Sequence, residues 1–145
     1  MQPFARDVRA AIMQAFQASG PTPTTHSIAQ VLGGEPVHVA SAFEELAQAH
    51  ALVLRPGSHD ILMAHPFSGV PTPHRVRIGD RSWFANCVWD GLAILALFGD
   101  GTLDTRYGGT TEPARFTVRA GAVQGEGIVH FLVPAREFWA DIGFT

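Results

Sequence analysis

Apolar side chains recur every four residues over the first sixteen positions, which is the spacing of one face of an amphipathic helix. The break Ser19-Gly20-Pro21 ends this pattern, so a first helix is predicted before residue 19. The repeating apolar positions are Phe4, Val8, Ile12 and Phe16.

Two further short helices are predicted before residue 50. Thr25 can cap the first of them, and Gly33-Gly34 ends it. Pro36 suits the first turn of the next helix. The apolar positions expected to face inward are Ile28, Val31 and Leu32 in the first helix, and Val39, Phe43, Leu46 and Ala47 in the second.

A hairpin follows the three helices. Residues 51–54 and 61–64 are apolar runs of strand length on either side of the turn Pro56-Gly57. Three helices and a hairpin are the element order of a winged helix, so residues 1–64 are predicted to form a winged-helix-like module. Residues 65–73 contain three prolines and are predicted to be an ordered linker.

The remainder of the chain predicts a small sheet around one apolar helix. Residues 87–98 are the most apolar segment and predict a buried helix, while Pro134 opens a last short helix. The strands are expected at residues 75–78, 82–85, 103–107, 114–119 and 128–133. The predicted fold class is therefore α+β, with the N-terminal module followed by a small mixed or antiparallel sheet domain over residues 74–145.

Composition and charge exclude several classes of protein. Apolar residues make up 46% of the chain and charged residues 16%, which is typical of a globular protein rather than a disordered one. The N-terminus lacks the continuous apolar run of a signal peptide, and the longest apolar stretch is too short to cross a bilayer. These features predict a soluble cytoplasmic protein without a membrane partner.

DNA binding by the N-terminal module is disfavoured by its charge. The third helix carries no arginine or lysine but has Glu44 and Glu45, and residues 1–64 hold three arginines against five acidic residues. A negative face repels the phosphates that supply most non-specific affinity for DNA. A structural or dimerising role is favoured, and a winged-helix transcriptional regulator stays as an alternative.

Cys87 and Asp90 are the candidates for chemistry. Cys87 is the only cysteine of the chain and begins the predicted apolar helix, where the helix dipole and free amides favour a thiolate. Asp90 lies three residues later on the same helix face. A carboxyl group kept neutral by burial would be a proton donor beside a soft nucleophile. The structural alternatives are a small buried side chain for Cys87 and a carboxylate that satisfies helix N-terminal amides for Asp90.

The stretch VRIGDRSWFANCVWDGLAILALFG resembles the organomercurial (alkylmercury) lyase family, in which a hairpin leads through an aromatic residue to Cys-x-x-Asp at the start of an apolar helix. The continuation GGTTEPARFTV is similar to the glycine-proline turn and core strand of that family. The resemblance implies protonolysis of carbon–mercury bonds. It also implies that Cys87 binds mercury as a thiolate and that Asp90, close to the metal, moves a proton onto the departing carbon.

The sequence departs from the family pattern at one position of the site. The family uses a second cysteine in the C-terminal part of the domain, and this sequence has none. An external small-molecule thiol would then supply the missing ligand, with mercury as substrate and product and no resident cofactor. The alternative is a non-catalytic binder or sensor of a thiophilic metal or a small apolar ligand on the same fold.

The seven histidines do not have the spacing of a zinc site. His59, His65 and His74 are expected in turns and in the linker. Most tryptophans in such a chain pack in the core or at its rim, although Trp83, Trp89 and Trp139 together could form one wall of an apolar pocket near Cys87.

Overall fold

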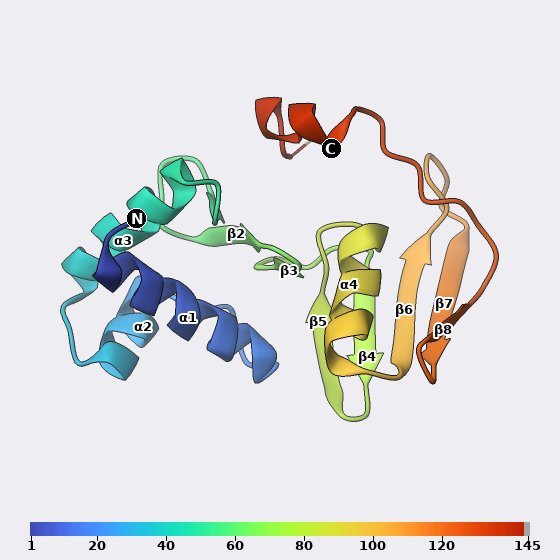
Figure 1. The fold of residues 1–145 in the computed structure, drawn as a ribbon, viewed down its shortest axis with the longest axis horizontal. Coiled ribbons are helices and arrows are strands. Elements are labelled where there is room, and N and C mark those ends of the chain that lie inside the picture. The colour runs from blue at the N-terminus through green and yellow to red at the C-terminus, as the bar shows by residue number, and fades with distance from the viewer. Residues whose placement is uncertain (144–145) are drawn as a thin grey trace.

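The computed structural model describes residues 1–143 and begins with three helices and a small sheet (Figure 1). The sheet is antiparallel with strand order β1-β2-β3. Its element order is that of a winged helix, and the stricter winged-helix assignment stays a prediction. The elements are α1 (Pro3–Gln17), α2 (Thr25–Leu32), α3 (Pro36–Gln48), β1 (Val53–Leu54), β2 (Ile61–Ala64) and β3 (Phe67–Ser68).

A five-stranded antiparallel sheet with order β5-β4-β6-β7-β8 forms the second half of the molecule, and α4 packs against it. The predicted α+β class, with helices first and antiparallel sheets after them, is confirmed. The elements are β4 (Arg75–Ile78), β5 (Arg81–Phe84), α4 (Val88–Phe98), β6 (Gly101–Arg106), β7 (Pro113–Arg119), β8 (Ala122–Gln124) and the short 3-10 helix η1 (Ala135–Ala140). Where one module ends and the next begins stays a prediction, and β3 lies inside the stretch predicted as a linker.

Local sequence signals account for the helix ends, with one correction. Thr24, rather than Thr25, caps α2: its hydroxyl accepts a hydrogen bond from the Ser27 amide at 3.1 Å, and the Ser27 hydroxyl accepts one from the Thr24 amide at 2.9 Å. This reciprocal pair is a capping box in which serine replaces the usual Glu or Gln. Gly33 ends the helix at φ 66°, in the left-handed region that glycine adopts without strain.

A ladder of aromatic rings joins the N-terminal helices to α4. Phe16 of α1 stacks on Phe67 of β3 at 5.2 Å between ring centroids, and Phe67 in turn lies 6.1 Å from Phe98 of α4. Trp83 stacks on Phe98 at 5.4 Å, and its indole N–H donates to the Phe16 carbonyl at 2.6 Å. Because Trp83 is buried and its polar atom is satisfied, these contacts fix the sheet against the N-terminal module.

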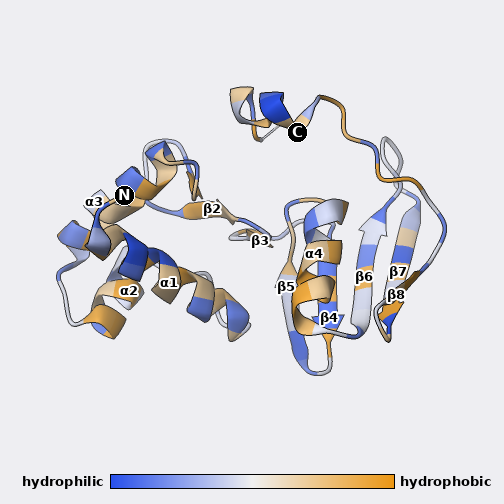
Figure 2. Ribbon diagram, viewed as in Figure 1, coloured by the Kyte–Doolittle hydropathy of each residue, from blue (hydrophilic) through white to orange (hydrophobic). Residues whose placement is uncertain are grey.

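Only one side of α4 is buried. Hydrophobic residues dominate this helix in Figure 2, and Gly91, Ile94 and Leu95 pack into the core. Trp89 and Leu97 are more than half exposed, at 57% and 64%. The prediction of a helix here is confirmed, and the prediction that it is buried holds for one face only, because the sheet covers a single face.

The strand predicted at residues 128–133 is wrong. Ala120 and Gly121 form a tight turn with positive φ, so β8 folds back at once and occupies the edge of β7. Gly125 and Gly127, also at positive φ, then direct the chain away from the sheet. Ile128 is 95% exposed as a result. Among the helices of residues 1–143, none is long and apolar enough to span a bilayer.

Gly69 is a position where a side chain should not fit. A Cβ placed there would overlap the backbone carbonyl of Ile61, and the Gly69 carbonyl itself accepts a hydrogen bond from the Thr22 hydroxyl at 2.7 Å. We expect Gly69→Ala to lower the free energy of unfolding by about 2–3 kcal/mol, since the backbone of Ile61 cannot move aside without disturbing the strand. Urea denaturation tests this, with Gly34→Ala as the control because its Cβ would meet open space. Equal stability of the two variants would contradict the expectation.

Candidate functional site

A short turn between β5 and α4 carries the two candidate side chains. Ala85, directly after β5, forms a bridge with Phe67, and its amide donates a hydrogen bond to the His74 carbonyl at 2.9 Å. Its own carbonyl accepts the Thr72 hydroxyl at 2.6 Å. With both of its polar backbone groups bonded, Ala85 sets the path by which the chain enters Cys87.

Cys87 is the N-cap residue of α4, as the sequence predicts. Its backbone is extended, with φ −148° and ψ −178°, and its carbonyl accepts the first helical bond from Gly91 at 3.0 Å. The thiol makes no capping hydrogen bond. The side chain is partly buried, and Asp90 lies in the first turn of the same helix.

Burial raises the pKa of the Cys87 thiol and is the largest influence on it. The amides of Asp90 and Trp89 act to lower that pKa, while the negative charge of Asp90 raises it further. The amides at the helix N-terminus act in the expected direction, which favours a thiolate, but burial has the larger effect. The loss of solvent raises the pKa of the thiol more than the helix terminus lowers it, so the sulfur keeps its proton near neutral pH.

Polar side chains hold the carboxyl group of Asp90. Its Oδ2 accepts a hydrogen bond from the Asn86 amide at 2.8 Å and lies 3.4 Å from Nδ1 of His65. The side chain of Asp90 is 16% exposed. The sequence suggested either a neutral acid in an apolar enclosure or a carboxylate bonded to helix amides. Neither interpretation included Asn86 and His65, which contact the carboxyl group. Asn86 stands four residues before Asp90, whereas no local signal points to His65.

A cavity of about 700 Å³ opens beside Cys87. Its walls come from the start of α4, the facing ends of β6 and β7, and the segment after β8, and they are mainly apolar. The sulfur is thus not sealed in the core. Asp90, expected beside Cys87 on the same helix face, is not part of the lining. The lining consists of His74, Cys87, Val88, Trp89, Thr105, Arg106, Tyr107, Gly108, Gly109, Ala114, Phe116, Gly127, Ile128, Val129, His130, Phe131 and Leu132.

Of the three tryptophans considered for a pocket wall, only Trp89 lines this cavity, and its ring meets Phe131 edge to face at 5.9 Å. Trp83 belongs to the aromatic ladder of the core. Trp139 stacks on His50 at 4.2 Å between ring centroids.

His74, which is expected in a turn or in the linker, is a second polar group of the cavity wall. Its Nδ1 lies 2.7 Å from the hydroxyl of Thr105, which is itself buried. Burial lowers the pKa of His74, and the charge of Asp90 offsets this only in part. A neutral, oriented imidazole therefore stands in the wall that contains Cys87. Within residues 1–143, no group of three or more histidine, cysteine or acidic side chains is placed to hold a metal ion.

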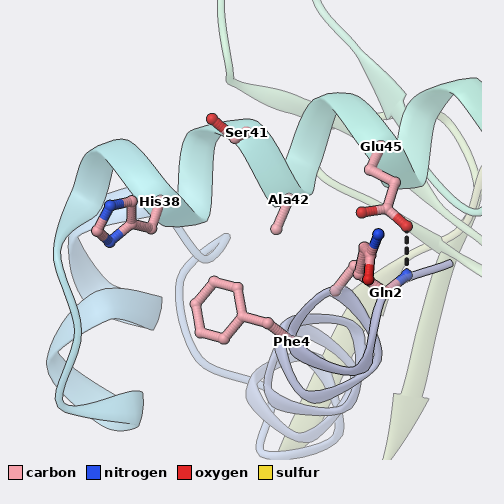
Figure 3. A pocket seen from close by; sticks show the side chains of 7 residues that line it. Gln2, Phe4, His38, Ser41, Ala42 and Glu45 are labelled. Atoms are coloured by element: carbon pink, nitrogen blue, oxygen red, sulfur yellow. Dashed lines mark hydrogen bonds between the residues drawn. The ribbon is translucent and has the colours of Figure 1, made fainter.

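A second hollow lies between α1 and α3 (Figure 3). Phe4, Ala5 and Ala42 form its apolar wall. Glu45 closes one end by accepting a hydrogen bond from the Gln2 amide at 2.5 Å. This hollow contains no thiol, so the chemistry expected of the chain belongs to the Cys87 cavity.

The raised pKa of Cys87 predicts an unusual pH profile for its alkylation. Only the thiolate attacks iodoacetamide, so the rate constant of the folded protein should still be rising above the ordinary cysteine pKa of about 8.5. The urea-denatured protein is the control and should level off at lower pH. Mass spectrometry of samples quenched at successive times measures both rates. If the rate constant of the folded protein levelled off at a lower pH than that of the denatured chain, the effect of burial would be contradicted.

Comparison with known proteins gives one family and one described structure. The alkylmercury lyase family model (MerB) matches residues 67–144, more than half of the chain. Among ten matching chains of solved structures is the mercury-bound form of MerB2, with 26% sequence identity and a TM-score of 0.67. The match covers 86% of this chain and 60% of the MerB2 chain. No curated protein matches the sequence.

Proposed function

The chain belongs to the alkylmercury lyase family, and from that premise we propose that it cleaves carbon–mercury bonds by protonolysis, with Cys87 as the mercury-binding group and Asp90 as the acid and base. The observation that carries the proposal is the placement of a partly buried thiol in the wall of an open cavity, one helical turn from a carboxyl group whose charge acts on it.

The raised pKa of the thiol suits a reaction that begins with sulfur protonated. When the mercury of R–Hg⁺ binds Cys87, the soft metal replaces the thiol proton, because a coordinating thiol is deprotonated. Asp90 accepts that proton and delivers it to the carbon of the carbon–mercury bond. The bonding pair passes to the carbon as the bond breaks, so the products are R–H and Hg²⁺ bound to the Cys87 thiolate. An external thiol then removes the mercury and returns a proton to Cys87.

The cavity is suited to an organic group attached to the metal. Its volume lies within the range of small-molecule sites, and aromatic side chains such as Trp89, Phe116 and Phe131 form much of its wall. An apolar organic group that enters it leaves water, while the metal remains at the sulfur.

A second candidate function is mercury capture without cleavage. The motivating observation is the single cysteine in 145 residues, since the resemblance implies two thiols at the site. One thiolate still binds mercury, and without a second protein ligand the carbon–mercury bond would be less strongly activated. MerB2, whose structure is known in a mercury-bound form, is longer than this chain, which spans 60% of it.

Incubation with phenylmercury and excess dithiothreitol separates the two functions. Headspace gas chromatography should detect benzene released over many turnovers by the wild type and none above background from Cys87→Ser. Stoichiometric mercury uptake without benzene would reject the lyase and favour capture. Absence of both would reject the two proposals together.

A further inference from the structure

His65 and Asn86 bring two nitrogen atoms to one oxygen of the proposed acid and base. The Asn86 amide nitrogen lies 2.8 Å from Oδ2 of Asp90, and Nδ1 of His65 lies 3.4 Å from that oxygen and from the amide nitrogen. We propose that His65 is a positioning residue for carbon–mercury cleavage: with Asn86 it fixes Oδ2 of Asp90 and leaves Oδ1 to carry the proton. This inference rests on the proposed function.

The surroundings of His65 select one tautomer. Its Nε2 is buried and has no hydrogen-bond partner among the described residues. A proton on Nε2 would therefore be a buried donor without a partner. The free-energy cost of such a donor exceeds the gain from one weak hydrogen bond. A proton on Nδ1 instead donates to a carboxylate, and such charge-assisted bonds are the stronger kind. The distance of 3.4 Å is long, as catalytic hydrogen bonds often are before substrate binds.

The orientation of Asn86 follows from the same carboxylate. With the amide reversed, its oxygen would face Oδ2 and repel it, whereas the nitrogen donates to it at 2.8 Å. Asn86 directly precedes the helix N-cap, so the turn between β5 and α4 sets its position. Two donors from different elements thus converge on one carboxylate oxygen.

Aromatic contacts restrict the ring of His65. Trp139 of η1 meets it edge to face, with centroids 6.0 Å apart and planes at 80°. The same Trp139 stacks on His50 at 4.2 Å, which fixes the indole against the N-terminal module. The His65 ring is therefore held by contacts from two separate parts of the chain, the segment 86–90 and Trp139 of η1. A histidine ring that cannot rotate freely fixes the orientation of the Asp90 carboxyl group more narrowly than water molecules would.

Two variants separate the hydrogen bond from the packing. His65→Phe keeps an aromatic ring for Trp139 and removes the donor, whereas His65→Asn loses the ring and keeps a donor nitrogen near the place of Nδ1. We expect His65→Phe to lower kcat for phenylmercury about 10- to 100-fold with KM little changed. His65→Asn should recover most of the loss. Equal kcat in the three proteins, or an equal loss in both variants, would overturn the proposal.

A nitrogen NMR measurement tests the inference without turnover. In wild-type protein at pH 7.5, His65 should show a protonated Nδ1 and a bare Nε2, and Asp90→Ala should abolish this preference. A protonated Nε2 in the wild type, or no response to Asp90→Ala, would overturn the proposal even if cleavage occurs. If the wild type and Cys87→Ser release equally little benzene, the proposed function fails and the positioning role fails with it. The tautomer then reports only whether the hydrogen bond exists.

Discussion

Asp90→Asn is expected to lower the single-turnover rate of benzene release from phenylmercury about 100- to 1,000-fold, while mercury uptake by the protein persists. Asparagine has the shape of aspartate but cannot take the proton from Cys87 and pass it to carbon, and a positioned acid and base typically contributes a factor of this size. The sulfur that binds the metal is unchanged. Rapid quench followed by gas chromatography measures the rate.

The control for this prediction is Asp60→Asn. Asp60 is a largely exposed carboxylate whose ion pair with Arg55 spans 3.8 Å, so its removal should change neither the rate nor the fold. If Asp90→Asn cleaved phenylmercury as fast as Asp60→Asn, the proton would have to come from another group. His74, which is neutral and lies in the cavity wall, would be the next residue to replace.

Cys87→Ser is expected to abolish mercury binding at one equivalent. A hydroxyl is a hard ligand that keeps its proton, and a soft divalent metal prefers sulfur. The prediction is one mercury atom per wild-type chain and less than about a tenth of that for the variant after gel filtration in EDTA. Elemental analysis of the protein peak gives the ratio.

Cys87→Ser should leave the fold intact, which makes the loss of mercury interpretable. Cys87 is the N-cap of α4, and serine is among the residues preferred there because its oxygen accepts a hydrogen bond from a helix amide. The melting temperature should therefore be equal or slightly higher. A variant that melts normally and still retains one mercury atom would refute the assignment of the metal to Cys87.

Sequence patterns predict the elements whose signals are local. Pro36 at the start of α3 and Gly33 at the end of α2 act through their own backbone geometry, and Cys87 was placed correctly at the start of α4. The false strand at residues 128–133 shows the limit of such signals. Those residues are apolar enough for a strand, but β8 already occupies the edge of β7 that they would need.

The candidate site depended on contacts that periodicity cannot encode. His65 is 25 residues from Asp90 and His74 is 31 residues from Thr105, and only the folded chain brings each pair together. The pKa of Cys87 also depends on more than its position in the sequence. Helix position and burial act on a thiol in opposite directions, and only the folded arrangement determines which is larger.

Proton delivery from the Cys87–Asp90 pair to carbon is the central step of the proposed reaction, and a single turnover in deuterium oxide tests it directly. Protein in excess over phenylmercury, with one equivalent of a small-molecule thiol as the second ligand, should yield one monodeuterated benzene per phenylmercury. Recovery of intact phenylmercury from denatured wild-type protein, or equal benzene release by Cys87→Ser, would contradict the account.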